Sequence, residues 1–133
     1  MKKCIAAVLM AACAQAAFSG SEGDVLAIDR LLAAPGTYNG KTVTVTAVAS
    51  IEFENMTLCE PGQRAFEHCV WLEIDPGPYD SEADNQRYKA ARAYWSRFNG
   101  KKVVVRGVFT SGPAGHWGLW RGEIGRVTSV SEP

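Results

Sequence analysis

The stretch that decides the fold is K-T-V-T-V-T-A-V-A-S at residues 41–50. Its alternate positions carry small apolar side chains, namely Val43, Val45, Ala47 and Ala49. Successive side chains of a β-strand point to opposite faces of the sheet, so this alternation predicts a half-buried strand. The alternation continues through Ile51 and Phe53 to a break near Asn55. It therefore predicts either one long strand that bends or two strands.

Four more segments are predicted to be strands. Residues 56–59 form a short one, and residues 69–75 follow after a polar loop at 60–68. In the strand at 69–75 we expect Val70, Leu72 and Ile74 to face inward, and Trp71, Glu73 and Asp75 to face outward. The last two strands are residues 101–110 and 120–130, with core candidates Val103, Val105, Phe109, Ile124 and Val127. Gly107 in the first of these marks a bulge or a close approach of two backbones.

Two helices are predicted as well. The apolar spacing from Val25 to Leu32 is helical, with Asp24 available as N-cap and Pro35-Gly36 as the end. Residues 81–99 form the second helix, since their apolar side chains gather near one face: Tyr88, Ala91, Tyr94, Trp95 and Phe98.

The predicted order is three strands, a helix and two strands. This is the order of the five-stranded Greek-key barrel called the OB-fold, in which the helix lies between strands three and four. The first helix is then an extra N-terminal piece. Residues 18–133 contain no linker or composition break, so we expect one domain.

The N-terminus has the features of an export signal. Lys2 and Lys3 precede a short apolar run, and Ala14-Gln15-Ala16 matches an A-x-A cleavage site. We therefore expect residues 1–17 to be removed and the protein to be periplasmic or secreted. The run is much shorter than the roughly 20 residues of a spanning helix. A buried N-terminal helix and a lipoprotein anchored through Cys13 are the alternatives.

Removal of the signal leaves two cysteines, Cys59 and Cys69. Two cysteines in an oxidising compartment usually pair, which predicts a disulfide. A metal site is the alternative, because Glu60 and His68 adjoin them, but the C-x-x-C and H-x-x-x-H spacings are missing. We expect no metal and no cofactor.

Three segments carry a resemblance to known proteins. They are L-L-A-A-P-G-T-Y-N-G-K at residues 31–41, C-V-W-L-E at residues 69–73 and G-H-W-G-L-W-R-G-E-I at residues 115–124. Together they resemble a group of small exported bacterial OB-fold proteins. The resemblance implies the OB-fold and export, and it brings no activity with it.

Composition and charge exclude several classes. Apolar residues are 47% and charged residues 21%, which excludes a disordered tail, a collagen-like fibre and a polytopic membrane protein. Basic and acidic residues balance at 14 each, so no global charge indicates a nucleic-acid binder. Residues 18–86 are mainly acidic and residues 87–133 mainly basic. The two parts either neutralise each other in space or leave a basic face for an anionic lipid or glycan.

The glycine-rich segment at residues 112–122 is the most unusual. On an OB-fold it joins strands four and five and borders the ligand face, which includes strand three. We expect one ligand site formed by Trp71, Glu73, His116, Trp117, Trp120 and Arg121. Aromatic rings beside carboxylates suit a sugar and also a peptide. In the alternative, Trp117 and Trp120 plug the ends of the barrel and His116 binds a backbone carbonyl.

We therefore expect a non-enzymatic binding or interaction module of the cell envelope. Its ligand is a glycan, a peptide or an envelope protein, and export argues against nucleic acid. Catalysis has little support, because His68 and His116 belong to no known catalytic motif. The alternatives are a structural accessory domain without a small ligand, and a small hydrolase that uses Glu73 and Asp75.

Overall fold

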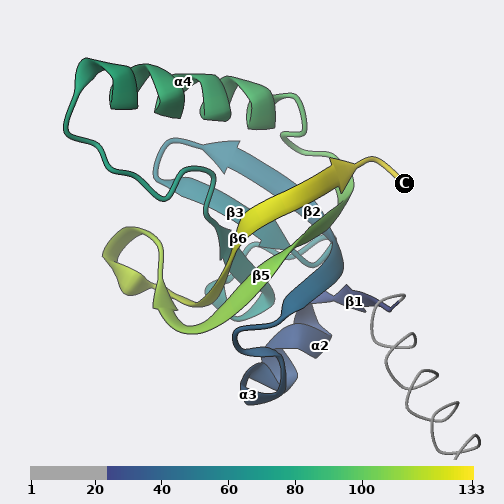
Figure 1. Cartoon of the computed structure of the whole chain (residues 1–133). Coiled ribbons are helices and arrows are strands. Elements are labelled where there is room, and N and C mark those ends of the chain that lie inside the picture. Colours follow the sequence, from purple (N-terminus) through teal and green to yellow (C-terminus); the bar gives the residue numbers. More distant parts are fainter. Residues whose placement is uncertain (1–23) are drawn as a thin grey trace, which may run out of the picture.

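The computed structural model describes residues 24–133. The expected export signal at residues 1–17 lies outside the described residues. The described chain forms a closed barrel of five strands, with one extra strand and three α-helices around it (Figure 1). This architecture confirms the predicted fold class.

The barrel strands are β2 (Thr42–Glu52), β3 (Asn55–Cys59), β4 (Cys69–Leu72), β5 (Lys102–Ala114) and β6 (Trp120–Ser131). Their order around the barrel is β2-β3-β4-β6-β5, and β5 pairs back onto β2 to close it. Neighbours are antiparallel except β4 and β6, which run parallel. Helix α4 (Glu82–Ser96) lies between the third and fourth barrel strands in sequence, which is the connectivity of an OB-fold.

Strand β2 has the predicted register. Its inward side chains Val43, Val45, Ala47 and Ala49 are buried in one core with Val70, Leu72, Val103, Val105, Phe109 and Ile124. The stretch proves to be two strands, because β2 ends at Glu52 and a turn of Phe53 and Glu54 leads into β3. Glu54 adopts a positive φ of 57° there, which is typical of a tight hairpin turn.

The N-terminal segment corrects a prediction. The helix expected to begin after Asp24 begins at Ile28 instead, because residues 25–27 form a strand that pairs parallel with β2. The elements here are β1 (Val25–Ala27), α2 (Ile28–Ala33) and α3 (Pro35–Tyr38). Strand β3 pairs with β2 only from Val48 onward. The edge of β2 that pairs with β3 is therefore free at residues 44–46, and β1 pairs with it there.

Helix α4 begins at a capping box. The hydroxyl of Ser81 accepts a hydrogen bond from the N–H of Asp84 at 3.1 Å, and the Asp84 carboxylate accepts one from the N–H of Ser81 at 3.2 Å. At the other end of α4, Trp95 and Phe98 are buried in the core, whereas Tyr94 is 45% exposed. Among residues 24–133, no helix has both the length and the apolar character needed to cross a membrane.

The prediction that Asp75 faces outward is wrong. Strand β4 ends at Leu72, and after it the Asp75 side chain turns inward until it is only 4% exposed. Nε of Arg87 on α4 donates to both carboxylate oxygens, at 3.1 and 3.0 Å, and the N–H of Gly77 donates at 3.0 Å. Burial raises the pKa of Asp75, but these donors outweigh it and hold the pKa below its usual value. The ion pair between Asp75 and Arg87 connects the first half of α4 to the segment that follows β4.

Cys59 and Cys69 form the predicted disulfide, with an S–S distance of 2.03 Å, and they lie opposite each other on β3 and β4. The loop between them contains η1 (Phe66–His68), a short 3₁₀ helix. Nδ1 of His68 lies 2.8 Å from Oδ1 of Asp29 on α2, and this hydrogen bond raises the pKa of His68. The loop is thus fixed at both ends.

The prediction of a close approach at Gly107 is confirmed. A Cβ there would lie 2.7 Å from the carbonyl oxygen of Gly125 on β6. The register of β5 and β6 shifts at the same place, between Arg106 and Val108. The loop that joins these two strands contains η2 (His116–Gly118), a short 3₁₀ helix within the predicted glycine-rich segment.

Candidate ligand-binding cleft

A cleft of about 440 Å³ opens where two loop tips of the barrel approach α4. Its walls come from the β2–β3 turn, from β3, β4 and β6, from the β5–β6 loop and from α4. The lining residues are Phe53, Glu54, Met56, Trp71, Glu73, Tyr88, Arg92, Gly115, His116 and Glu123. A second cavity of about 440 Å³ shares Met56, Trp71, Glu73 and Tyr88 and adds Tyr79 and Asn85. We call these two cavities together the aromatic cleft.

The aromatic cleft lies on the face where OB-folds hold ligands. That face consists of strands two and three, and the loops between strands one and two and between strands four and five flank it. Here β3 supplies Met56 and β4 supplies Trp71, while the two loops supply Glu54 and His116. The strand and loop positions predicted from the sequence therefore meet in one cleft.

Trp71 forms a fixed aromatic surface in this cleft. Its ring centroid lies 4.9 Å from that of Trp120, which is only 5% exposed and contacts the ring of Phe66 edge to face at 5.0 Å. A Cβ on Gly115 would lie 2.4 Å from the Trp71 ring and 2.7 Å from the Trp120 ring. Only glycine fits at position 115, because its backbone lies close to both indole rings.

Two carboxylates converge beside Trp71. The parallel pairing of β4 and β6 places Glu123 opposite Trp71. A Cβ on Gly125 would lie 3.3 Å from Cβ of Glu73 and 3.8 Å from Oε2 of Glu123, so both side chains lie next to the space that Gly125 leaves. Carboxylates in this position accept hydrogen bonds from hydroxyl or charged donors.

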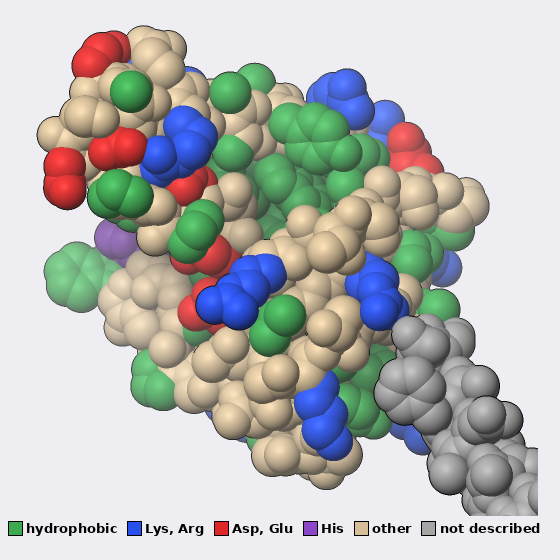
Figure 2. All heavy atoms as spheres, viewed as in Figure 1, with side chains coloured by type: hydrophobic (Ala, Val, Ile, Leu, Met, Phe, Trp, Pro, Cys, Tyr) green, Lys and Arg blue, Asp and Glu red, His purple; other side chains and the backbone are tan. Residues whose placement is uncertain are grey.

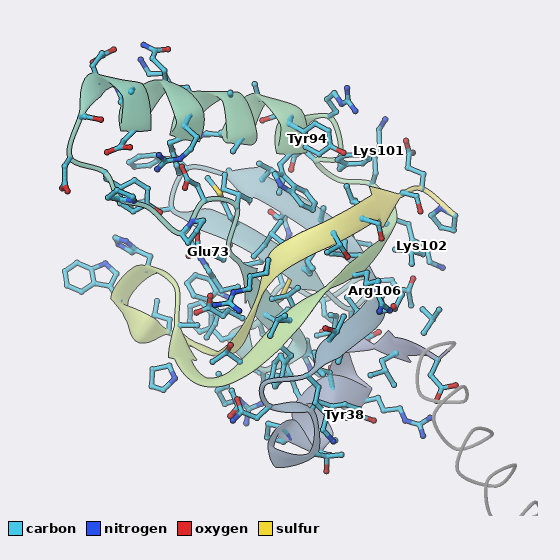
Figure 3. The ribbon with its side chains drawn as sticks, in the orientation of Figure 1. Tyr38, Glu73, Tyr94, Lys101, Lys102 and Arg106 are labelled. Atoms are coloured by element: carbon cyan, nitrogen blue, oxygen red, sulfur yellow. A yellow bond between two sulfur atoms is a disulfide. The ribbon has the colours of Figure 1, made fainter. Side chains whose placement is uncertain are left out.

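The pKa of the Glu73 carboxyl is raised above its ordinary value. Burial raises the pKa of its carboxyl, and the negative charges of Glu123 and Asp75 raise it further. The N–H of Asp75 donates to Oε1 of Glu73 at 3.0 Å and lowers the pKa in part. The net result is a raised pKa, because removal from water penalises the charged form. Figure 3 shows Glu73 beside β6, on the side that faces α4.

The rim of the cleft joins the two loop tips. Nε2 of His116 lies 3.5 Å from Oε2 of Glu54, which links the β5–β6 loop to the β2–β3 turn. Two large aromatic side chains next to this link are open to solvent: Phe53 is 74% exposed and Trp117 is 82% exposed. Trp117 also has a φ of 63°, a conformation that costs a bulky residue free energy.

Helix α4 supplies the opposite wall. The ring of Tyr88 packs edge to face against Tyr79 at a centroid distance of 6.0 Å. Asn85 and Arg92 lie three residues before and four residues after Tyr88, so the three side chains share one face of the helix. This face adds an amide and a guanidinium to the cleft.

The structure separates the predicted site residues into three groups. Trp71, Glu73 and His116 line the aromatic cleft, and Trp117 stands at its rim. Trp120 is buried behind Trp71, so its ring supports the site and does not face a ligand. Arg121 is exposed and is not a lining residue of the cleft.

Sequence reasoning missed the contributions of α4 and of the β2–β3 turn. The sequence places Tyr88 on the apolar face of the helix, which indicates packing against the barrel but not the edge of a cleft. Arg92 and Asn85 interrupt that face with polar groups, and this was the available signal. The alternation predicts that Phe53 faces inward, but β2 ends at Glu52 and Phe53 lies exposed in the turn. Nothing in the sequence indicates that this turn borders a cleft, because such turns are common in any hairpin.

The uneven charge is partly neutralised across the fold. Arg87 of the basic part binds Asp75 and Asp84 of the acidic part at 3.0 and 2.7 Å.

Within residues 24–133, no group of three His, Cys, Asp or Glu side chains is placed to hold a metal ion.

No protein-family model, no curated protein and no solved structure matches this chain.

Proposed function

We propose that the protein is an exported, non-catalytic binding module of the cell envelope that holds a glycan chain in the aromatic cleft. The observation that carries the proposal is the fixed ring of Trp71 beside Glu73 and Glu123 on the ligand face of the barrel. A sugar stacks its C–H face on an aromatic ring and donates hydroxyl hydrogen bonds to carboxylates. Both partners are available here within one cleft.

The shape of the cleft favours a chain over a single sugar. Each of its two cavities is about 440 Å³, which is within the usual size of a small-molecule site. They meet at Trp71 and Tyr88, so consecutive sugar units would occupy neighbouring positions along the same aromatic wall.

Export is part of the proposal on two grounds. The charged, apolar and A-x-A pattern of residues 1–17 is typical of a secretory signal. The disulfide between Cys59 and Cys69 is the kind of bond that persists in oxidising compartments.

Calorimetric titration with hexasaccharides of β-linked N-acetylglucosamine, β-linked glucose and α-linked glucose tests the proposal. We expect at least one to bind, and Tyr88→Ala to weaken it about tenfold, as expected for the loss of one stacking ring. Tyr94→Ala is the matched control, because it removes the same side chain from the same helix but outside the aromatic cleft. The proposal fails if none of the three binds, or if both variants weaken binding equally.

A small hydrolase is the second candidate. The observation that favours it is the raised pKa of Glu73 next to the carboxylate of Glu123, since glycosidases pair a protonated carboxyl with an ionised one. Chromatography of the same mixtures separates the two functions. If shortened oligosaccharides appear with the natural protein but not with Glu73→Gln, the function of the protein is hydrolysis and not binding alone.

A further inference from the structure

A groove between α4 and β6 adjoins the aromatic cleft and shares Glu73 and Glu123 with it, but the rest of its lining has no role in the function proposed above. Its volume is about 850 Å³, and it extends along β6 from Glu123 to Val130. Its apolar lining comes from α4, β5, β6 and the segment after β4: Ile74, Pro76, Tyr94, Trp95, Val108, Val127 and Val130. Figure 2 shows hydrophobic side chains gathered between α4 and β6.

One edge of β6 is free along this groove. On its other edge β6 pairs with β5 almost throughout, up to Ser131. On the groove side, β4 pairs with β6 only at Glu123 and Ile124, and the N–H of Glu73 adds one bond to the carbonyl of Ile124 at 2.9 Å. Among residues 24–133, no strand pairs with that edge of β6 after Gly125. A free strand edge presents N–H and C=O groups that pair with another main chain.

The regular part of this edge lies beyond a bulge. Residues 126–128 stand opposite Gly107 alone, and regular pairing with β5 returns at Ser129, Val130 and Ser131. Thr128, Ser129 and Val130 also line the groove. The free main-chain groups and the apolar lining are therefore in the same place.

Charge distinguishes the two ends of the groove. Glu73 and Glu123 line it near the start of β6, Arg126 lines it three residues after Glu123, and Tyr94 lies toward the other end (Figure 3). Among the described residues, no Lys, Arg or His nitrogen lies within 4.0 Å of the carboxylate of Glu73 or Glu123. A cationic side chain is the natural complement of two adjacent carboxylates without a basic partner.

We propose that the groove binds an extended peptide segment, which adds to the free edge of β6 as a further strand and places a Lys or Arg side chain against Glu73 and Glu123. Alternate side chains of the peptide pack on Tyr94, Val127 and Val130. Main-chain pairing supplies affinity and the side-chain contacts supply selectivity, as in other cases of strand addition. From Gly125 to Ser131 the edge spans about seven residues, or roughly 23 Å of extended chain.

The test uses a fluorescent peptide, acetyl-Lys-Val-Thr-Val-Thr-Val-Thr-amide, and the purified protein. Fluorescence anisotropy measures the affinity, and amide hydrogen exchange locates the site. We expect binding below about 1 mM, with new protection of alternate amides among Ser129, Val130 and Ser131, because only every second N–H of a strand points to its free edge. The same peptide with N-methyl groups on every valine and threonine cannot donate main-chain hydrogen bonds from either of its edges, and its affinity should fall at least about tenfold.

Protein variants test the side-chain contacts. Tyr94→Ala should weaken the peptide about tenfold, whereas Tyr88→Ala, on the wall of the aromatic cleft, should leave it within about twofold. In the natural protein, replacing the peptide's Lys by norleucine should lower affinity. Glu123→Gln, which keeps the shape of the side chain, should shrink that difference.

Three outcomes would overturn the proposal. The first is no binding at about 1 mM, because strand addition tolerates many sequences. The second is equal affinity for the N-methylated peptide. The third is a dimer, seen by sedimentation without peptide, that the peptide dissociates, because the occupant of the edge would then be a second copy of this chain. The glycan experiment is independent of all three, since Tyr88→Ala and Tyr94→Ala have opposite expected effects in the two assays.

Discussion

Replacing Gly115 by alanine is expected to destabilise the protein and to displace the floor of the aromatic cleft. The new Cβ would lie 2.4 Å from the Trp71 ring and 2.7 Å from the Trp120 ring, well inside contact distance. The backbone adds a second effect, because Gly115 has φ 74° and ψ −165°. Residues other than glycine rarely adopt this conformation.

A matched variant separates the two effects. Gly112 also has a positive φ, of 112°, but a Cβ there would meet nothing within 4 Å. Backbone strain costs about 1–3 kcal/mol at either position. Overpacking against the two indoles adds about 1–3 kcal/mol at Gly115 alone. We therefore expect Gly115→Ala to be less stable than Gly112→Ala by about 1–3 kcal/mol.

Urea unfolding of the oxidised protein, followed by tryptophan fluorescence, measures the difference. With a slope of about 1.5 kcal/mol per molar urea, the midpoint of Gly115→Ala should lie about 0.7–2 M below that of Gly112→Ala. Near-ultraviolet circular dichroism should change for Gly115→Ala, since Trp71 and Trp120 shift. Equal midpoints and unchanged spectra would refute the claim that this glycine seats the Trp71 ring.

Three further predictions concern the core, the disulfide and the cleft carboxyl. Val105→Ala should lower the free energy of unfolding by about 1.5–3 kcal/mol, because it leaves a cavity. Val104→Ala, on the half-buried face of the same strand, should lower it clearly less. Equal losses in urea unfolding would mean that the strand register is wrong by one residue. Replacing both Cys59 and Cys69 by serine should cost about 2–3 kcal/mol in the loop-entropy model, and an unchanged urea midpoint would contradict a bridge. Glu73→Gln should raise the free energy of unfolding near neutral pH, because the raised folded-state pKa of Glu73 means that its ionised form destabilises the fold. The gain should fade as the pH falls from the folded-state pKa to the unfolded-state pKa of this carboxyl, where the group is protonated in both states. A gain that persists in acid, by the same assay, would show another cause.

The barrel was largely predictable because its strands carry their burial in local alternation. Val43 and Val45 alternate with threonines, and Val103 and Val105 face the core in the same way. A period of two identifies which side chains are inside without knowledge of the partner strand. Asn-Gly pairs before β2 and β5, and the proline and glycine residues after β4, mark where the elements end.

Local pattern failed where a distant partner decided the outcome. Residues 25–27 have helical spacing, yet they form a strand because the edge of β2 is free beside them. Asp75 has the spacing of an outward residue, yet it is buried because Arg87, twelve residues later, compensates its charge. Neither partner can be inferred from the neighbouring residues alone.

The same division holds for the candidate site. The sequence by itself predicted that Trp71 and Glu73 point to the same side of one extended segment, and that a glycine-rich loop carries His116 and Trp117. Only the tertiary structure decided that Trp120 lies behind Trp71 while Tyr88 faces the cleft. The order of side chains along the chain sets which face of an element each occupies, but the packing of elements from distant segments sets which of those faces meet. Closure of the barrel and the position of α4 over it therefore determine which rings are covered and which remain open to a ligand.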